Sequence, residues 1–294
     1  MNRQEIIKAY AAWGAVCLFW GTTYLAIRIG VQRVPPALFA GVRFIIAGVL
    51  FLAYLRWRGY PMPKRQEWLH MAIVGISLLV MANGLVVWAE QWVPSGLTAV
   101  IIATLPFWSA GLESVLPSGE RLTLRKVLGI LIGFAGVIIL FAPEMGESFD
   151  KAYWNGVIVL VFVPFFWSAG SIYSKHHPIQ CPPLVAAGTQ TLIAGLVLTA
   201  IGTAFGEWSE FTLDGKGMAA IAYLIVFGSI VGYSSFIYAL SKLPITTVSM
   251  YAYINPVIAV LLGWLILDER LDWSVATATT VVLLGVALVK SAKA

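Results

Sequence analysis

Long apolar runs recur along the whole chain, and short polar connections separate them. A helix rises about 1.5 Å per residue, so about 20 residues cross a hydrocarbon core of about 30 Å. The runs are continuous rather than alternating, which predicts membrane-spanning helices instead of barrel strands. Ten spans are expected, over residues 9–29, 35–56, 67–89, 95–116, 123–142, 153–174, 182–205, 217–240, 245–267 and 273–290.

The second half of the chain repeats landmarks of the first half. Phe19-Trp20 and Pro35-Pro36 return 147 residues later as Phe166-Trp167 and Pro182-Pro183. Two Ala-Gly pairs in the second span return at the same offset, and half of 294 residues is 147. A fixed internal period indicates a repeat architecture.

The repeat predicts two five-helix units, residues 1–147 and 148–294, with no soluble domain. Five spans is an odd number, so two copies must cross the bilayer in opposite directions. Such inverted repeats are common in secondary transporters, whose substrate site lies near the midplane between the halves. The expected fold is therefore an all-α integral membrane protein with ten transmembrane helices in two inverted-topology repeats.

The basic residues are distributed unevenly between the two sides of this arrangement. With the N-terminus inside, the inner segments hold thirteen Lys and Arg residues and the outer segments hold five. Basic residues gather in cytoplasmic loops, so both termini are expected in the cytoplasm. The inner set is Arg3, Lys8, Arg56, Arg58, Lys64, Arg65, Arg121, Arg125, Lys126, Lys175, Lys242, Lys290 and Lys293.

Composition agrees with a membrane protein, because 60% of the residues are hydrophobic and only 11% are charged. A soluble domain is typically about 45–50% apolar and about 25% charged. The net charge of +5 is therefore interpreted as an orientation signal and not as a nucleic-acid surface. The first apolar run resembles a signal peptide, but it is long enough to span and is expected to be a retained helix.

Several stretches resemble the drug/metabolite transporter superfamily, and within it the EamA-type group of bacterial metabolite exporters. They are FWG at 19–21, GVRF at 41–44, and YINPVIAVLLGWLILDERL at 253–271. Among members of this group, the chain is most similar to bacterial aromatic amino-acid exporters. The resemblance implies a bacterial inner-membrane exporter. It also implies a central cavity formed by the first, third, fourth, sixth, eighth and ninth helices, with the fifth and tenth peripheral and no ATP site.

Trp20 and Trp167 are the leading candidates for the transport pathway, because both fall near the middle of their spans. Tryptophan usually concentrates at the membrane interface, where its N–H reaches water. An indole at the midplane needs a partner or a wet cavity. Helix packing is the alternative for both residues.

Polar and aromatic residues also interrupt spans that could consist of Leu and Val. Polar groups in hydrocarbon are costly unless they pair or face water, although interhelical hydrogen bonding is an alternative explanation. An aromatic cavity with a few amides suits an amphipathic solute with an apolar or aromatic side chain. The further substrate-binding candidates are Asn83, Trp88, Trp108, Tyr233, Tyr238, Tyr251, Tyr253 and Asn255.

Pro106 and Pro256 occupy matched places in the fourth and ninth spans. Proline inside a helix removes a main-chain hydrogen bond, so each residue predicts either a static kink or a gating hinge. Arg43 lies within the second span, where an arginine is a functional candidate by default. Its alternative is a structural role, with its long side chain reaching outward to the interface.

The predicted function is secondary export of amino acids and related small amphipathic metabolites, with aromatic ones favoured, by alternating access. The partners are then the solute and the lipid bilayer, with no nucleic acid, no cofactor and no metal. A monomer is expected, although Gly129–Gly133 and Gly228–Gly232 spacings leave a dimer possible.

A nucleotide-sugar or organophosphate exchanger would need several basic residues in the cavity. An integral-membrane enzyme would need a cluster of catalytic side chains at one depth, and the sequence shows no such cluster. Proton coupling stays open beside facilitated movement.

If Trp20 and Trp167 line the pathway, replacing either with Ala should reduce transport more than Trp57→Ala. Trp57 lies at the end of a span, where an interfacial role is expected. Flux of labelled phenylalanine in proteoliposomes measures the effect. Equal losses in the three variants would contradict the placement.

Overall fold

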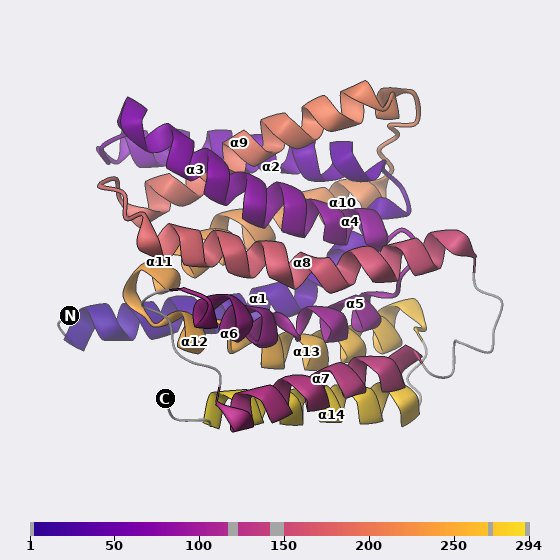
Figure 1. Cartoon of the computed structure of the whole chain (residues 1–294). Helices are drawn as coiled ribbons and strands as arrows, with labels where there is room; N and C mark the ends of the chain where they lie inside the picture. Colours follow the sequence, from indigo (N-terminus) through magenta and orange to yellow (C-terminus); the bar gives the residue numbers. More distant parts are fainter. Residues whose placement is uncertain (1–2, 117–122, 142–149, 270–272, 292–294) are drawn as a thin grey trace.

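The computed structural model describes residues 3–116, 123–141, 150–269 and 273–291, and in these residues all regular structure is helical (Figure 1). The α-helices are α1 (Arg3–Val31), α2 (Pro36–Trp57), α3 (Trp68–Gly75), α4 (Leu85–Ala89), α5 (Ser95–Ile102), α6 (Leu105–Ser114), α7 (Leu124–Phe141), α8 (Lys151–His176), α9 (Pro183–Ala204), α10 (Gly215–Tyr223), α11 (Ser234–Lys242), α12 (Ile245–Val248), α13 (Tyr251–Leu267) and α14 (Trp273–Ser291).

Two of the predicted spans contain π-helical stretches. Between α3 and α4 the chain is π-helical over η2 (Ile76–Gly84), and between α10 and α11 it is π-helical over η5 (Leu224–Tyr233). Short 3₁₀ turns cover Arg65–Glu67 and Glu207–Ser209. Taken as continuous series, the described elements form ten helical segments at the ten predicted positions.

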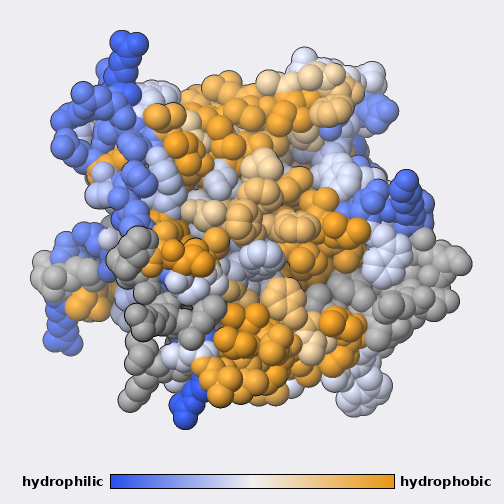
Figure 2. All heavy atoms as spheres, in the orientation of Figure 1, coloured by the Kyte–Doolittle hydropathy of each residue, from blue (hydrophilic) through white to orange (hydrophobic). Residues whose placement is uncertain are grey.

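The lengths and composition of these segments suit a bilayer. In the described part of the chain, seven helical segments are long and apolar enough to cross a membrane, and two shorter apolar helices follow near the C-terminus. Apolar side chains cover the middle of the visible face in Figure 2, and hydrophilic residues gather at its two ends. α1 begins and α14 ends at the same end of the bundle, here named the terminal end, and the opposite end is named the distal end (Figure 1).

α1 and α8 lie near the centre of the bundle and have matching neighbours. α1 packs against α13 and against the α10–η5–α11 segment, whereas α8 packs against α5–α6 and the α3–η2–α4 segment. α7 and α14 pack chiefly against each other along one edge of the bundle (Figure 1). The two central helices therefore carry the residues that can meet in the middle.

α2 and α9 cross at very close range because glycines lie at their interface. A Cβ at Gly195 would lie 2.5 Å from the main-chain nitrogen of Ile45, and a Cβ at Gly48 would lie 2.8 Å from Cα of Leu192. Small residues let helices approach this closely in a membrane. The seam formed by these contacts pairs Gly41 with Thr199, Ile45 with Gly195, Gly48 with Leu192 and Leu52 with Gly188.

The pairing of α2 with α9 is antiparallel, because residue numbers rise along α2 as they fall along α9. α7 and α14 meet in the same manner. A Cβ at Gly136 would lie 2.8 Å from the nitrogen of Val282, and a Cβ at Gly285 would lie 2.5 Å from the nitrogen of Gly133. Both pairings thus depend on glycine at the crossing point.

Gly195→Ala and Gly14→Ala make a matched test of this seam. A methyl at Gly195 must displace the backbone of α2, which should destabilise the protein by about 1–3 kcal/mol. Gly14 lies in α1 with nothing within 4 Å of its added Cβ, so there the higher helix propensity of Ala should be neutral or stabilising. The apparent melting temperature in detergent should therefore fall only for Gly195→Ala. Equal melting temperatures would show that the seam is not close-packed.

Candidate functional site

A small cavity of about 70 Å³ lies between the two central helices. Its lining comes from α1, α2, η2, α4, α5, α8, η5 and α13. The second span therefore contributes to the cavity as well, which the family resemblance did not imply. The polar and aromatic lining residues are Trp20, Thr23, Tyr24, Arg43, Phe44, Asn83, Trp167, Ser229, Tyr233 and Tyr251.

In this conformation the central cavity is too small to hold a substrate. One water needs about 10–15 Å³ of such space, and sites for small molecules usually span about 300–1,000 Å³. The central cavity thus has room for a few waters but not for a solute the size of an amino acid. A solute can occupy it only after the surrounding helices separate.

The two repeat-related tryptophans meet in this cavity. The ring centroids of Trp20 and Trp167 are 5.2 Å apart with an interplanar angle of 86°. Trp20 also meets Tyr251 edge-on at 5.1 Å, and Phe236 lies 5.2 Å from Trp20 and 5.1 Å from Trp167. Edge-to-face pairs are favourable, by about 0.5–1.5 kcal/mol each beyond area burial. The four rings of Trp20, Trp167, Phe236 and Tyr251 are called the aromatic cluster below.

The two indole N–H groups differ in their hydrogen bonding. Nε1 of Trp20 donates to the carbonyl of Gly228, in the π-helical stretch η5, at 3.1 Å. Nε1 of Trp167 is buried and has no hydrogen-bond partner among the described residues. A buried donor without a partner costs about 1–3 kcal/mol, so Trp167 presents a free donor at the cavity.

Arg43 stays inside the protein and does not reach outward to the interface. Its side chain is 3% exposed, it donates to Oδ1 of Asn83, and its guanidinium lies 4.5 Å from the ring centre of Phe44. Its Nε has no hydrogen-bond partner among the described residues. The outward-reaching alternative is therefore wrong for Arg43, and its charge is available at the cavity.

A second hydrogen bond occupies the equivalent place in the other half. The hydroxyl of Tyr233 donates to Oε1 of Gln190 at 2.7 Å, and both groups are buried. Gln190 follows Arg43 by 147 positions, and Tyr233 follows Asn83 by 150. The charged pair Arg43–Asn83 in the first half thus corresponds to the neutral pair Gln190–Tyr233 in the second half.

The other candidates lie outside the central cavity. Trp88 lines a larger hollow of about 650 Å³ at the distal end, between the α1–α2 connection, α4 and α9. Trp108 packs edge-on against Phe165, with ring centres 5.7 Å apart. Tyr253 lines a hollow of about 440 Å³ beside Trp13.

Tyr238 and Asn255 complete the predicted set. Tyr238 is half-buried against the hydrophobic core and does not line the central cavity. The amide nitrogen of Asn255, in the orientation that satisfies both its ends, donates to the carbonyls of Cys17 and Tyr251 at 3.1 and 3.2 Å. Asn255 thus links α13 to α1.

The prolines of the segments around the cavity occupy different positions in their helices. The fourth segment is interrupted at Ala103-Thr104, and Pro106 lies in the first turn of α6, where no helical N–H is needed. Pro256 lies inside α13, as expected from the sequence. Pro164, inside α8, also lines the cavity.

Carboxylates tie helix starts to other segments of the chain. Glu269 accepts hydrogen bonds from the main-chain N–H groups of Ser95 and Gly96, which open α5, at 2.8 and 3.1 Å. Glu207 accepts from Ala37 and Leu38 at the start of α2. A negative charge at a helix N-terminus satisfies free donors and the helix dipole together.

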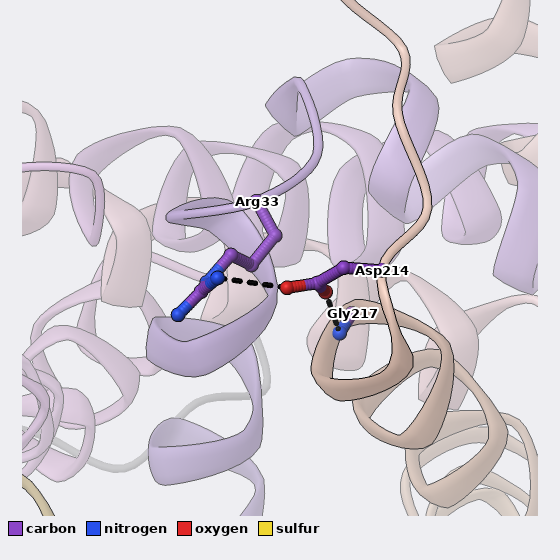
Figure 3. Close-up of polar contacts among 3 residues, drawn as sticks. All are labelled: Arg33, Asp214 and Gly217. Carbon is purple, nitrogen blue, oxygen red and sulfur yellow. Dashed lines mark hydrogen bonds and ion pairs between the residues drawn. The ribbon is translucent and has the colours of Figure 1, made fainter.

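Two further carboxylates accept hydrogen bonds from main-chain N–H groups near helix starts. Glu67 accepts from the main-chain N–H groups of Gln180 and Cys181, just before α9. At the distal end Asp214 accepts from the N–H of Gly217 and from Arg33, each at 2.7 Å (Figure 3). The N–H of Gly217, followed by the Arg33 guanidinium, holds the pKa of Asp214 below its usual range.

No group of three or more His, Cys, Asp and Glu residues within the described segments is arranged to hold a metal ion. The site instead consists of aromatic rings, one guanidinium, one amide and hydroxyl groups. Such groups bind and orient a solute.

Comparison with known proteins decides the family. The model of the EamA-like transporter family matches the chain twice, over residues 8–142 and 154–291. The chain belongs to the EamA-like transporter family. It is a multi-pass transporter of the bacterial inner membrane, within the drug/metabolite transporter superfamily.

Relatives of this EamA-like transporter carry similar descriptions. The uncharacterized inner membrane transporter YedA of Escherichia coli (strain K12) is 35% identical over 294 residues, which cover 100% of this chain and 94% of YedA. Protein PagO of Salmonella typhimurium (strain LT2) is 28% identical over 249 residues, which cover 83% of this chain and 80% of PagO. A solved crystal structure with 22% identity has the same fold, with a TM-score of 0.69 and 95% of both chains covered.

Tyr233→Phe tests the hydrogen-bonded pair beside the cavity. The substitution leaves the buried amide oxygen of Gln190 without its donor, so stability should fall by about 1–3 kcal/mol. Tyr10→Phe is the control, because Tyr10 is 48% exposed. Thermal unfolding in detergent should show a lower melting temperature for Tyr233→Phe alone. A shared shift in both variants would argue against the pair.

Proposed function

We propose that this transporter exports amino acids and related small amphipathic metabolites, with aromatic side chains favoured. The observation that carries the proposal is the aromatic cluster around Trp20 and Trp167, which borders the central cavity beside a buried Arg43. The proposed substrate-binding residues are the candidates from the sequence that also line the cavity, namely Trp20, Arg43, Asn83, Trp167, Tyr233 and Tyr251.

Each part of an aromatic amino acid finds a suitable group there. A carboxylate can accept from the free Nε of Arg43 and from the unpartnered indole N–H of Trp167. Rings of Trp20 and Tyr251 can contact an aromatic side chain edge-on, and their faces attract an ammonium group. The lining contains no carboxylate, so the ammonium group would depend on ring faces and amide oxygens.

Alternating access would come from two five-helix repeats, residues 1–147 and 148–294, of opposite topology. Three observations support this arrangement. The family model matches twice, α2 and α9 run antiparallel, and contacts at the seam are exchanged by the offset of 147. Gly41 with Thr199 becomes Gly188 with Leu52, since 41 and 52 plus 147 give 188 and 199.

The direction of export depends on orientation. We propose that the terminal end is cytoplasmic, because thirteen of the Lys and Arg residues fall in segments on that side. The distal end is then periplasmic. Pro256 and the interruption before Pro106 are proposed hinge points, since each weakens helical bonding in a segment that borders the cavity.

An exchanger of nucleotide sugars or organophosphates is the second candidate within this fold. Phosphate binding would need several basic side chains, and Arg43 is the single Lys or Arg among the residues that line the central cavity. The observed lining therefore favours a zwitterion over a phosphate.

Flux in proteoliposomes tests the proposal directly. The purified chain should move labelled phenylalanine and tryptophan, and Trp167→Phe should slow this movement, because it keeps a ring but removes the free N–H. Trp57→Phe is the matched control, since Trp57 is 79% exposed. Loss of one hydrogen bond to a charged carboxylate should lower the flux about tenfold. Absence of flux for every amino acid in well-folded protein would overturn the proposal, and saturable flux of a phosphate ester would support the exchanger.

A further inference from the structure

Glu90 is a buried carboxyl group that the proposed solute site does not use. It lies in the turn between α4 and α5 at the distal end, after the third span, and it is 0% exposed. Neither of its carboxyl oxygens has a hydrogen-bond partner among the described residues. Buried carboxylates are almost always paired or hydrogen-bonded, so this one needs an explanation.

Charged and titratable groups approach Glu90 from three neighbouring segments. They are Tyr24 and Arg28 on α1, Arg43 on α2, and Glu269 after α13. Arg28 donates to the main-chain carbonyl of Glu90 and is held there. α8 meets this turn through Gly156, which carries no charge.

The balance of these effects favours a neutral carboxyl group. Burial raises the pKa of Glu90 well above its usual range, and the nearby Glu269 carboxylate acts in the same direction against Arg28 and Arg43. A neutral acid loses much less on leaving water than a carboxylate with no hydrogen bond. A neutral carboxyl group therefore fits these surroundings better than a carboxylate does.

The same turn leads directly into the contact between α5 and the end of α13 at the distal end. Ser95 and Gly96, which start α5, are held by the Glu269 carboxylate from the end of α13. Separation of α5 from α13 would break these bonds and move the turn that carries Glu90. Water would then reach a carboxyl group that lies beside two guanidinium groups.

We propose that Glu90 is a proton-binding site that controls the distal opening of the transporter. Its carboxyl group is protonated while the α4–α5 turn and the start of α5 are packed against α1 and α13, the arrangement here called the closed distal end. When the α4–α5 turn separates from α1 and α13, the O–H bond breaks, the proton passes to water on the distal side, and the carboxylate remains near Arg28 and Arg43. Closure requires that a proton return from the same side. The inference rests on the proposed alternating access and adds its dependence on proton concentration.

The test measures the distal opening without any solute. Nitroxide labels at Gln32→Cys and Gln91→Cys, with Cys17 and Cys181 replaced by Ala, report the distance between the α1–α2 connection and the α4–α5 turn in nanodiscs. In the otherwise unaltered chain, the ratio of open to closed forms should rise with pH by up to about tenfold per unit, because one proton is released on opening. A distance distribution that is the same from about pH 5 to about pH 9 would overturn the proposal.

Glu90→Gln should hold the distal end closed at every pH, since the amide is neutral and has nearly the same shape. Glu210→Gln is the matched control, because Glu210 is an exposed carboxylate at the same end, and it should keep the full pH dependence. If Glu90→Gln kept the pH dependence, another group would be responsible for it, and the proposal would be overturned. If Glu90→Gln fails to fold, Glu90→Asp should shift the midpoint of the pH dependence, and an unchanged midpoint would overturn the proposal.

These outcomes are separate from those of the solute assay. A chain that moves phenylalanine but shows no pH-dependent opening retains the proposed function and loses this proton site. A chain that opens with pH but moves no amino acid retains the proton site and loses the proposed solute.

Discussion

The main constraint on this protein is that its backbone must satisfy its own polar groups where lipid surrounds it. Regular α-helix does so, and departures from it are tolerated where protein or a wet cavity covers the exposed groups. The described departures gather around the central cavity: η2 and η5 are π-helical, α8 contains Pro164, and the fourth segment is interrupted at Ala103-Thr104. The carbonyl of Gly228 in η5 accepts from Trp20. The site thus lies where the described helices are least regular.

The outer helices are regular and close-packed, in contrast with this central region. α2 and α9 approach until the backbone of one limits the side chains of the other, as Gly195 and Ile45 show. Helix starts are held in addition by carboxylates from other segments, such as Glu207 on α2 and Glu269 on α5. The first contact lies just beyond one end of the α2–α9 seam, whereas the second joins α5 to the end of α13, which separate in the proposed mechanism. Equivalent interactions thus lie beside a close-packed seam in one place and, in the proposed mechanism, at a reversible closure in another.

The positions of the ten helical segments could be predicted from the sequence because long apolar runs mark them, and seven of the described segments are long and apolar enough to cross a membrane. The meeting of Trp20 and Trp167 also followed from their common depth and their repeat offset. The position of Arg43 did not follow, since depth along a helix does not state whether a side chain turns inward. Trp88 lies in a different hollow for the same reason. The π-helical stretches carry no recognisable residue pattern, and the contact of Glu269 with α5 joins residues 174 positions apart. Contacts of this range depend on how the segments pack, which periodicity cannot specify.

The seam between α2 and α9 bears on the ancestry of the chain. Its contacts map onto one another under the offset of 147, with Gly41 and Gly48 in one half and Gly188 and Gly195 in the other. A single five-helix ancestor inserted in both directions would form the same seam with its own second copy, with no new residue required. Under that proposal, residues near the cavity could diverge after gene fusion, since Arg43 corresponds to Gln190, while glycine lies at the crossing in both halves. Such an ancestry would let a symmetric contact support an asymmetric cavity.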